Sequence, residues 1–387
     1  MKEMNVAIIG YKFMGKAHSH AWKNSGLFFD LPIKPVLKVA CGRHAEPLRE
    51  FADRWGWEEI ETDWRKVVAR KDIHIIDIAL PTNLHKEIAV EAARNGKHIF
   101  CEKPMAMNVA EAKEMLQAVQ AAGVTHYINH NYRRCPAVQL AKQMIDEGRV
   151  GRVFHWRGAY LQSWIVDPSF PLTWHLRKEV AGFGPHYDLN SHSIDLAQFL
   201  IGDIKRVSAM TTNFITERPL PDEVAAGTFK AATTKGGGTG KVTVEDAAFV
   251  LAEFANGALG SFEATRFAPG RKNFNYFEIY GSKGSILFDL ERMNELQYLS
   301  LDDPEYAQGF RTILATEPVH PYVSHWWPPG HIIGYEHEFH HAVADFLTAV
   351  DTGQPIRPNF EDGLKTMKVL EAALRSAESG KAVVVEA

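Results

Sequence analysis

Cysteine is scarce in this 387-residue chain, which contains only Cys41, Cys101 and Cys135. Three widely separated cysteines cannot build a disulfide framework, and their spacing does not match a zinc site. We therefore expect three buried thiols that pack as small apolar side chains. No bound metal is expected.

A large excess of charge is also missing, because 43 basic and 47 acidic side chains leave a net charge of -4. This balance gives no reason to expect nucleic acid or an anionic membrane as a partner. No apolar run approaches the ~20 residues of a membrane helix, and the N-terminal stretch is typical of a strand rather than a signal peptide. We expect a globular, cytoplasmic protein that acts on a small molecule.

The first third of the chain alternates short β-branched runs with amphipathic stretches. The pattern predicts strands over 5–9, 35–41, 73–79, 98–101 and 125–129, and helices over 16–25, 46–55, 84–95 and 109–122. Such alternation is typical of a parallel sheet with right-handed crossovers. Residues 1–134 are therefore expected to form a doubly wound Rossmann domain of the α/β class.

Beyond Arg134 the pattern changes to longer alternating strands and tight turns. Helices are predicted over 136–148, 187–200, 334–352 and 362–379, strands over 152–161, 204–214, 247–254, 258–266, 275–281 and 284–289, and a glycine-rich loop over 235–240. Residues 135–387 are expected to form an α+β domain with a large, mainly antiparallel open sheet.

The binding site is expected in the cleft between the two domains. An apolar sheet face predicts a homodimer or homotetramer.

The turn after the first predicted strand carries an altered dinucleotide fingerprint. Lys12 stands where G-x-G-x-x-G has its middle glycine. The outer glycines permit the tight turn and the packing of helix on strand, while Lys12 brings positive charge toward the pyrophosphate. The residues predicted to bind a nicotinamide cofactor here are Gly10, Lys12, Phe13, Met14 and Gly15.

The second strand is followed by Gly42, Arg43 and His44 rather than by the acidic residue that binds the ribose 2′-hydroxyl of NAD. Arg43 and His44 could face a 2′-phosphate instead. The residues at this position therefore weakly favour NADP, but the choice between NAD and NADP stays open.

Two further strand ends carry polar residues where parallel sheets bind ligands. They contain Pro81, Thr82, Asn83 and His85 after the third strand, and Glu102, Lys103 and Pro104 after the fourth. Burying a charged side chain at a strand end costs free energy, so a charged pair there indicates a functional role. Lys103 could hydrogen-bond a substrate hydroxyl and the cofactor ribose together.

Asp188 and His192 lie four residues apart in the helix predicted over 187–200, so they are expected to share one helix face. A histidine can act as a base near neutral pH, which suits removal of a hydroxyl proton as hydride leaves carbon. A metal site of His186, Asp188 and His192 fits the residue types but is not favoured.

Aromatic and amide side chains lie close together around Gln162, Trp164 and His175. Ring stacking combined with hydrogen bonds suits a sugar, although the same residues could be core aromatics. The aromatic-rich segment Pro321–Tyr335 could close the cleft or form a subunit contact.

Taken together, these motifs resemble the Gfo/Idh/MocA family, named for glucose–fructose oxidoreductase, inositol dehydrogenase and rhizopine catabolism. The likeness covers essentially the whole chain and rests on Gly10…Gly15, Pro81…His85, Glu102-Lys103-Pro104, Asn131–Arg134 and Asp188…His192. The runs Phe13–Ser19, Tyr160–Trp164 and Gly334–Glu336 are similar to its sugar 3-dehydrogenases. The resemblance implies NAD(P)-dependent oxidation of a sugar hydroxyl at C3, with NAD favoured.

The resemblance also implies roles for residues. His192 would be the acid/base, Lys103 would hold the reacting hydroxyl, and Asp188 would orient the sugar. The residues implied to contact or border the substrate are Arg133, Gln162, Trp164 and Tyr335.

A second activity found among the family's relatives stays open. An NAD-dependent glycosidase oxidises C3 transiently, eliminates the aglycone, adds water and returns the hydride. It needs a further acid or base, for which His175, His186 or Tyr187 could serve. Basic residues would suit an anionic, for example sulfonated, glycoside: Arg133, Arg134, Arg177 and Lys178.

Overall fold

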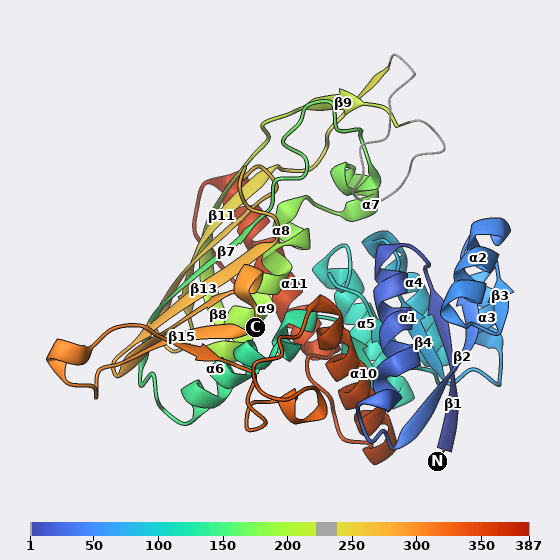
Figure 1. Cartoon of the computed structure of the whole chain (residues 1–387). Helices are drawn as coiled ribbons and strands as arrows, with labels where there is room; N and C mark the ends of the chain where they lie inside the picture. Colours follow the sequence, from blue (N-terminus) through green and yellow to red (C-terminus); the bar gives the residue numbers. More distant parts are fainter. Residues whose placement is uncertain (1, 222–237, 387) are drawn as a thin grey trace. The chain divides into compact units, whose positions relative to one another are not determined.

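The computed structural model describes residues 2–221 and 238–386 (Figure 1). The chain forms two compact units, the first comprising Met1–Asn131 and Gly334–Met367, the second Tyr132–Ile333 and Lys368–Ala387. This differs from a linear division into 1–134 and 135–387, because a late segment folds with the N-terminal sheet. Of the expected loop 235–240, residues 235–237 lie outside the described ranges.

The first unit contains a six-stranded, all-parallel sheet in the order β3-β2-β1-β4-β5-β6. Its strands are β1 (Lys2–Ile9), β2 (Ile33–Cys41), β3 (Glu59–Glu61), β4 (Ile75–Ile78), β5 (His98–Cys101) and β6 (His126–Ile128). β4 is buried along its whole length, as expected of a strand covered on both faces. The predicted Rossmann sheet is confirmed, and ligands of such sheets bind at the carboxyl ends of the strands.

Helices connect these strands and cover the sheet. They are α1 (Phe13–Asn24), α2 (Ala45–Trp55), α3 (Trp64–Ala69), α4 (His85–Arg94) and α5 (Val109–Ala122). A later helix, α10 (Tyr335–Thr352), packs on α1. Its Phe339 and Phe346 rings lie 5.5 and 6.1 Å from those of His18 and Trp22. These aromatic contacts explain why the late segment belongs to the first unit.

The second unit contains a nine-stranded sheet in the order β16-β15-β14-β13-β7-β12-β11-β8-β17. Its strands are β7 (Val153–Leu161), β8 (Ile204–Thr212), β11 (Ala247–Phe254), β12 (Leu259–Thr265), β13 (Phe274–Gly281), β14 (Gly284–Asp289), β15 (Glu295–Ser300), β16 (Arg311–Leu314) and β17 (Val383–Val384). Only β7 and β12 pair in parallel in this sheet, so the prediction of a mainly antiparallel sheet is confirmed.

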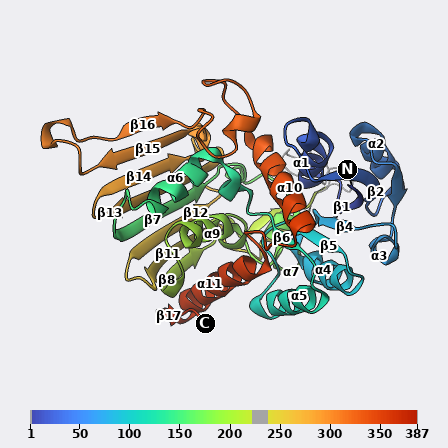
Figure 2. The same cartoon turned by 90° about the horizontal axis from the view of Figure 1, so that it is seen from below.

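Helices cover one face of this second sheet. α6 (Pro136–Asp146) packs on β14 and β15, and α9 (Asn190–Leu200) packs on β7 and β12 (Figure 2). α11 (Phe360–Ser379) begins in the first unit and ends in the second. The short strands β9 (Glu217–Pro219) and β10 (Thr239–Lys241) pair separately.

One predicted element is wrong in a way that matters for the site. The helix expected over 187–200 is two helices, α8 (Pro185–Asp188) and α9, which are separated at Leu189. Asp188 is therefore the last residue of α8, and His192 lies in the first turn of α9. The two side chains do not share one face of a continuous helix. No glycine or proline marks the break, so spacing alone could not reveal it.

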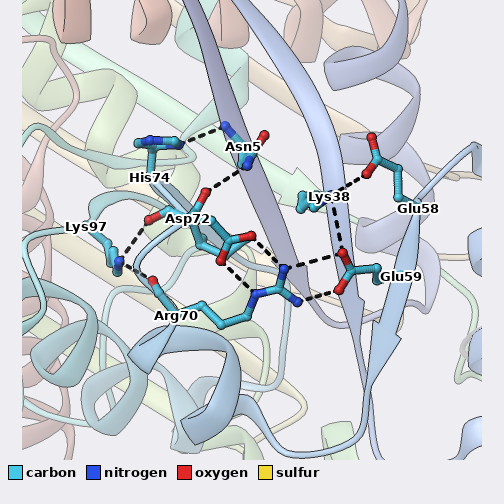
Figure 3. A network of polar contacts seen from close by, with 9 residues as sticks. Asn5, Lys38, Glu58, Glu59, Arg70, Asp72, His74 and Lys97 are labelled. Carbon is cyan, nitrogen blue, oxygen red and sulfur yellow. Dashed lines mark hydrogen bonds and ion pairs between the residues drawn. The ribbon is translucent and has the colours of Figure 1, made fainter.

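At the edge of the first sheet where the strands begin, a polar network ties loops to strands (Figure 3). Arg70 pairs with both Glu59 and Asp72. The buried Lys97 Nζ donates to the backbone carbonyl oxygens of Arg70 and Ile73, at 2.6 and 2.8 Å. Exposed ion pairs contribute little to stability, so the bonds of Lys97 to loop carbonyls are the stronger part of this network.

Three histidines stand at the same edge: His74 before β4, His98 at the start of β5 and His126 at the start of β6. In each ring Nδ1 accepts a backbone N–H, from Asn5, Thr125 and Phe360, at 3.0, 3.1 and 3.1 Å. An accepting ring nitrogen carries no proton. Burial lowers the pKa of all three side chains, that of His126 to about 4.

We expect the first unit to lose stability as the pH falls from about 6.5, the usual histidine pKa, toward 4. In this window these three histidines bind more protons in the unfolded chain than in the folded one, so they make the free energy of unfolding decrease on acidification. Urea unfolding at several pH values measures this. His126→Leu should flatten the fall, whereas the exposed His331→Leu should not. An equal slope in His126→Leu and the wild type would contradict the expectation.

Candidate active site

The turn between β1 and α1 has the close backbone approach that a dinucleotide cradle needs. Gly10 has φ +119°, and a Cβ on it would lie 2.1 Å from the carbonyl oxygen of Ala79. A Cβ on Gly15 would lie 2.2 Å from the carbonyl oxygen of Gly10. Neither position admits a side chain, and α1 presents its first N–H groups directly after this turn. These residues fit a bound pyrophosphate.

Lys12 stands at the N-cap of α1 with a negative φ of -82°, so this position does not need the left-handed conformation that favours glycine. The replacement of the middle glycine therefore leaves the turn intact. The exposed Lys12 ammonium lies 5.3 Å from the ring centroid of Tyr11. Phe13 stacks on Tyr335, with centroids 6.2 Å apart, so Tyr335 belongs to the first unit. Met14 is half-buried in the first turn of α1.

His85 links the segments that follow β4 and β5. Its Nδ1 and Nε2 lie 3.0 and 2.8 Å from the carbonyl oxygens of Pro104 and Leu80, and the ring is buried. Both ring nitrogens are thus engaged by the protein, which gives His85 a bracing position. The other residues predicted there, Pro81, Thr82 and Asn83, lie in the turn that includes the short helix η2 (Thr82–Leu84).

Glu102 is held by a buried charge cluster that the sequence reasoning missed. His18 Nδ1 lies 2.8 Å from Asp77 Oδ1, and His18 Nε2 lies 2.9 Å from Glu102 Oε1. Asn129 Nδ2 donates to the same Glu102 oxygen at 2.6 Å. Burial opposes the charged ring, but the two carboxylates outweigh it and raise the pKa of His18 to about 10.

The same cluster fixes the backbone that carries Lys103. Glu102 Oε2 accepts the N–H of Lys103 at 3.1 Å. Despite complete burial, the pKa of Glu102 lies below its usual value because His18 and Asn129 stabilise the carboxylate. The half-buried Lys103 thus extends from a segment anchored to a buried, charged cluster.

In the second unit, Asp188 is oriented by an arginine that the sequence reasoning also missed. Arg266 follows β12, its side chain is 1% exposed, and its Nη2 donates to Asp188 Oδ2 at 2.6 Å. Its guanidinium lies over the ring of Trp164, 5.2 Å from the centroid. The Asp188 side chain is 34% exposed. A buried cation therefore holds a carboxylate that a ligand can reach.

His192 lies against two tyrosines at the start of α9. Its ring centroid is 4.5 Å from that of Tyr132 and 5.8 Å from that of Tyr160. The two tyrosine hydroxyls are 2.8 Å apart. The ring of His192 is thereby fixed by packing on two sides.

An amide network continues from these tyrosines to two predicted substrate residues. Asn273 Oδ1 accepts from Tyr160 Oη at 2.7 Å and from Gln162 Nε2 at 3.0 Å. Trp164 Nε1 donates to Gln162 Oε1 at 2.7 Å. Gln162 and Trp164 are half-buried. The second unit thus brings them into one hydrogen-bonded group with the tyrosines beside His192, and Asn273 is a member that the sequence did not indicate.

Arg133, expected to border the substrate, forms a buried bidentate pair with Asp195. Its Nε and Nη2 lie 2.7 and 2.6 Å from the two Asp195 oxygens. Its guanidinium also lies over the ring of Phe199, 4.9 Å from the centroid. These contacts neutralise its charge within the protein.

His186 is buried, and both of its ring nitrogens contact the protein. Nε2 lies 2.9 Å from the carbonyl oxygen of Leu370, and Nδ1 lies 3.3 Å from Asn190 Nδ2. Burial lowers the pKa of His186 to about 4. A substrate could reach neither nitrogen without displacing these contacts. His175 is also buried and stacks on Trp174, with centroids 3.7 Å apart.

Within residues 2–221 and 238–386, no group of three or more histidine, cysteine, aspartate or glutamate side chains could hold a metal ion. Cys41, Cys101 and Cys135 are buried and outside any disulfide, as predicted. Burial raises the pKa of Cys41 to about 12, which makes it a poor nucleophile. In the described part of the chain, no helix is long and apolar enough to cross a membrane.

Comparison with known families agrees with both units. The model of an oxidoreductase family with an NAD-binding Rossmann fold matches residues 4–130, and the GFO/IDH/MocA C-terminal domain matches residues 138–287. The chain therefore belongs to the Gfo/Idh/MocA family of oxidoreductases, and NAD is its cofactor.

Individual proteins similar to this chain include one curated relative and two solved structures. Levoglucosan dehydrogenase of Pseudarthrobacter phenanthrenivorans is 43% identical over 381 residues, which cover 97% of each chain. A solved levoglucosan dehydrogenase complex with NADH and levoglucosan has a TM-score of 0.93 and 42% identity over all of both chains. An oxidoreductase domain protein from Kribbella flavida has a TM-score of 0.94 and 46% identity over all of both chains.

Proposed function

We propose that this chain oxidises a secondary hydroxyl of a neutral sugar, at C3, with NAD as the hydride acceptor. The observation that carries the proposal is the polar group of the second unit. There the buried Arg266 forms an ion pair with Asp188, whose carboxylate a ligand can reach. Arg266 also contacts the ring of Trp164, and Trp164 donates a hydrogen bond to the side-chain amide of Gln162. Sugars are bound by such combinations of stacking and directed hydrogen bonds. The similarity to levoglucosan dehydrogenase supports the same substrate class.

In the proposed mechanism, the turn from Gly10 to Gly15 and the first N–H groups of α1 would hold NAD⁺, which would supply the hydride acceptor when bound. His192 takes the proton of the reacting hydroxyl, so that alcohol and NAD⁺ become ketone, NADH and a proton. The Lys103 ammonium donates to the reacting oxygen and stabilises the negative charge that develops on it. Asp188 accepts a hydrogen bond from a sugar hydroxyl and fixes the orientation of the ring.

A neutral substrate is favoured over an anionic one because two buried arginines of the second unit, Arg133 and Arg266, are already paired with carboxylates. Arg133 is neutralised by Asp195, and Arg266 by Asp188. A sulfonated sugar would need a cation that these carboxylates do not engage.

The glycosidase alternative is disfavoured because none of the three residues predicted to supply its extra acid or base, His175, His186 and Tyr187, is suited to that role. Both ring nitrogens of His186 are engaged, and burial depresses its pKa. Tyr187 is buried, and burial moves its pKa far above the usual value. His175 is covered by Trp174.

The test is incubation of the purified chain with NAD⁺ and a panel of neutral sugars and anhydrosugars that includes levoglucosan. We expect NADH to form in amounts equal to a 3-keto product identified by NMR. Release of an aglycone from a glycoside without net NADH would overturn the proposal in favour of the glycosidase. NAD⁺ binding without turnover of any member of the panel would also count against it.

We also propose that the chain forms a homodimer or homotetramer through the open face of the second sheet. Met210, Phe249, Leu251 and Leu259 are exposed there. Met210 pairs with Phe249 across β8 and β11, so their side chains share one face. An exposed apolar surface of this kind is typical of an interface.

Light scattering after gel filtration is expected to show a dimer or tetramer at micromolar concentration. Leu251→Lys together with Met210→Lys should dissociate it, because two charges would be buried in an apolar interface. Val319→Lys changes another exposed apolar residue, away from this sheet face, and should leave the oligomer intact. A wild-type monomer would contradict the proposal.

A further inference from the structure

The segment that follows β7 carries two of the side chains proposed to bind the sugar, Gln162 and Trp164. From residue 162 to residue 173 the chain forms only turns and loops, with no helix or strand. Buried carbonyl groups that no helix or sheet satisfies need other hydrogen-bond donors. The orientation of the Trp164 ring therefore depends on the side chains that hold this segment.

Arg218 on β9 holds the segment through its backbone. The Arg218 side chain is fully buried, and its Nη1 donates to the carbonyl oxygens of Asp167 and Phe170 at 2.8 and 3.2 Å. Its Nη2 donates to the carbonyl oxygen of Ile165 at 2.5 Å. The planar guanidinium presents its donors in a fixed fork, so one side chain can satisfy three carbonyl groups of the same loop.

The charge of Arg218 is not matched by a carboxylate. Among the residues that the structure describes, its hydrogen bonds all go to backbone oxygens, and it forms no ion pair. Asp246 attracts it from a distance, but Asp246 Oδ2 accepts the N–H groups of Phe214 and Ile215 at 2.7 and 3.0 Å. Burial therefore lowers the pKa of Arg218. A buried cation without a charged partner is costly, so the backbone that it holds is a better explanation for Arg218 than packing.

The held segment in turn fixes the Trp164 ring. Ile165 follows Trp164 directly, and the Phe170 ring packs against the Trp164 ring at 76°, with centroids 5.2 Å apart. The same indole contacts Arg266, the ion-pair partner of Asp188. Without the three bonds of Arg218, Ile165 and Phe170 would be released, and the indole would lose its fixed orientation relative to the Asp188 carboxylate.

We propose that Arg218 is a positioning residue for sugar binding and acts on the sugar through Trp164. It holds the indole in place before the sugar arrives, so that binding does not have to order the loop. Its contribution therefore lies in sugar affinity and not in hydride or proton transfer. The inference rests on the function proposed above, which assigns Trp164 to the sugar and the chemical step to Lys103 and His192.

Steady-state kinetics of Arg218→Lys and Arg218→Met with the best sugar of the panel test the proposal. Both variants should raise the KM for the sugar by about tenfold or more, while kcat changes by less than about threefold. Lysine keeps the charge but lacks the fork of donors, so it should not restore KM. The dissociation constant of NAD⁺, measured by titration, should keep its wild-type value. Arg292→Met changes an exposed arginine of the same unit and should alter neither constant.

A double-mutant cycle separates positioning of Trp164 from general stabilisation of the second unit. In a Trp164→Ala background, Arg218→Lys should leave the sugar KM unchanged, because the ring through which it acts is gone. Phe170→Leu interrupts the same chain of contacts without touching the buried charge and should also raise KM, so the test does not depend on the folding of the Arg218 variants. Circular dichroism checks that each variant is folded.

Wild-type KM in a folded Arg218 variant or in Phe170→Leu would overturn the inference. An equal further rise of KM when Arg218→Lys is added to Trp164→Ala would overturn it as well. Failure of the proposed function looks different, because the wild-type chain itself would then form no NADH with any sugar of the panel, and the inference would fall with it.

Discussion

Replacing Lys103 or His192 by alanine is expected to lower kcat by about 10²–10⁴-fold, the range for a positioned general acid or base. Lys103→Ala removes the cation that would stabilise developing charge on the sugar oxygen. His192→Ala removes the proposed proton acceptor. NAD⁺ affinity, measured by titration, should change little in either variant, because the glycine turn and α1 hold the dinucleotide.

Two exposed residues provide matched controls for this prediction. Lys113 on α5 and His331 lie on the surface, and their alanine variants should keep wild-type kcat. Steady-state kinetics with the best sugar of the panel make the comparison. If Lys103→Ala or His192→Ala turned over at the wild-type rate, the assigned role of that residue would be wrong.

The second large effect is expected on stability. His18→Ala leaves Asp77 and Glu102 buried without their shared cation, and breaking a buried ion pair on one side costs about 3–5 kcal/mol. Urea unfolding at pH 7 should show this loss. The double variant His18→Gln with Asp77→Asn removes charge from both partners and should lose less stability than His18→Ala.

The pH dependence of stability shows whether the His18 cluster stabilises the fold through its charges or only through packing. His18 has a folded pKa of about 10, above the unfolded value of about 6.5. Its contribution to stability is therefore complete below about pH 6.5 and is lost as the pH rises through 10. His18→Ala should lack this alkaline loss. A variant that unfolds with the wild-type midpoint and pH profile would show that the cluster carries no such charge.

Much of the fold was accessible from local sequence patterns. The strand ending at Ile9 and the helix 109–122 could be predicted because the spacing of apolar residues within a short stretch of sequence indicates each element. Gly10 and Gly15 could be singled out since only glycine fits such a turn, and the structure gives the reason in two backbone contacts of about 2 Å. The break at Leu189 was missed because it follows from how α8 and α9 pack, which no residue there signals.

The candidate site was only partly accessible. Lys103 and Asp188 were predicted as site residues from residue type and motif, but the groups that hold them were not predicted. A buried aspartate in the apolar strand Ile75–Ile78 was a usable signal for Asp77. Nothing local distinguished Arg266 or Asn273 from other polar residues near strand ends.

The sequence by itself indicated most of the alternating strands and helices of the first unit, the glycine turn, the Glu-Lys-Pro strand end and membership of the family, because each depends on residues close together in the chain. It gave no sign of β3, α3, β15 and β16. Only the tertiary structure decided which partners complete the site. His18 meets Asp77 across 59 positions, Arg266 meets Asp188 across 78, and Gln162 meets Asn273 across 111. Such pairs depend on strand order and register, which arise when the whole sheet forms and not from any local pattern.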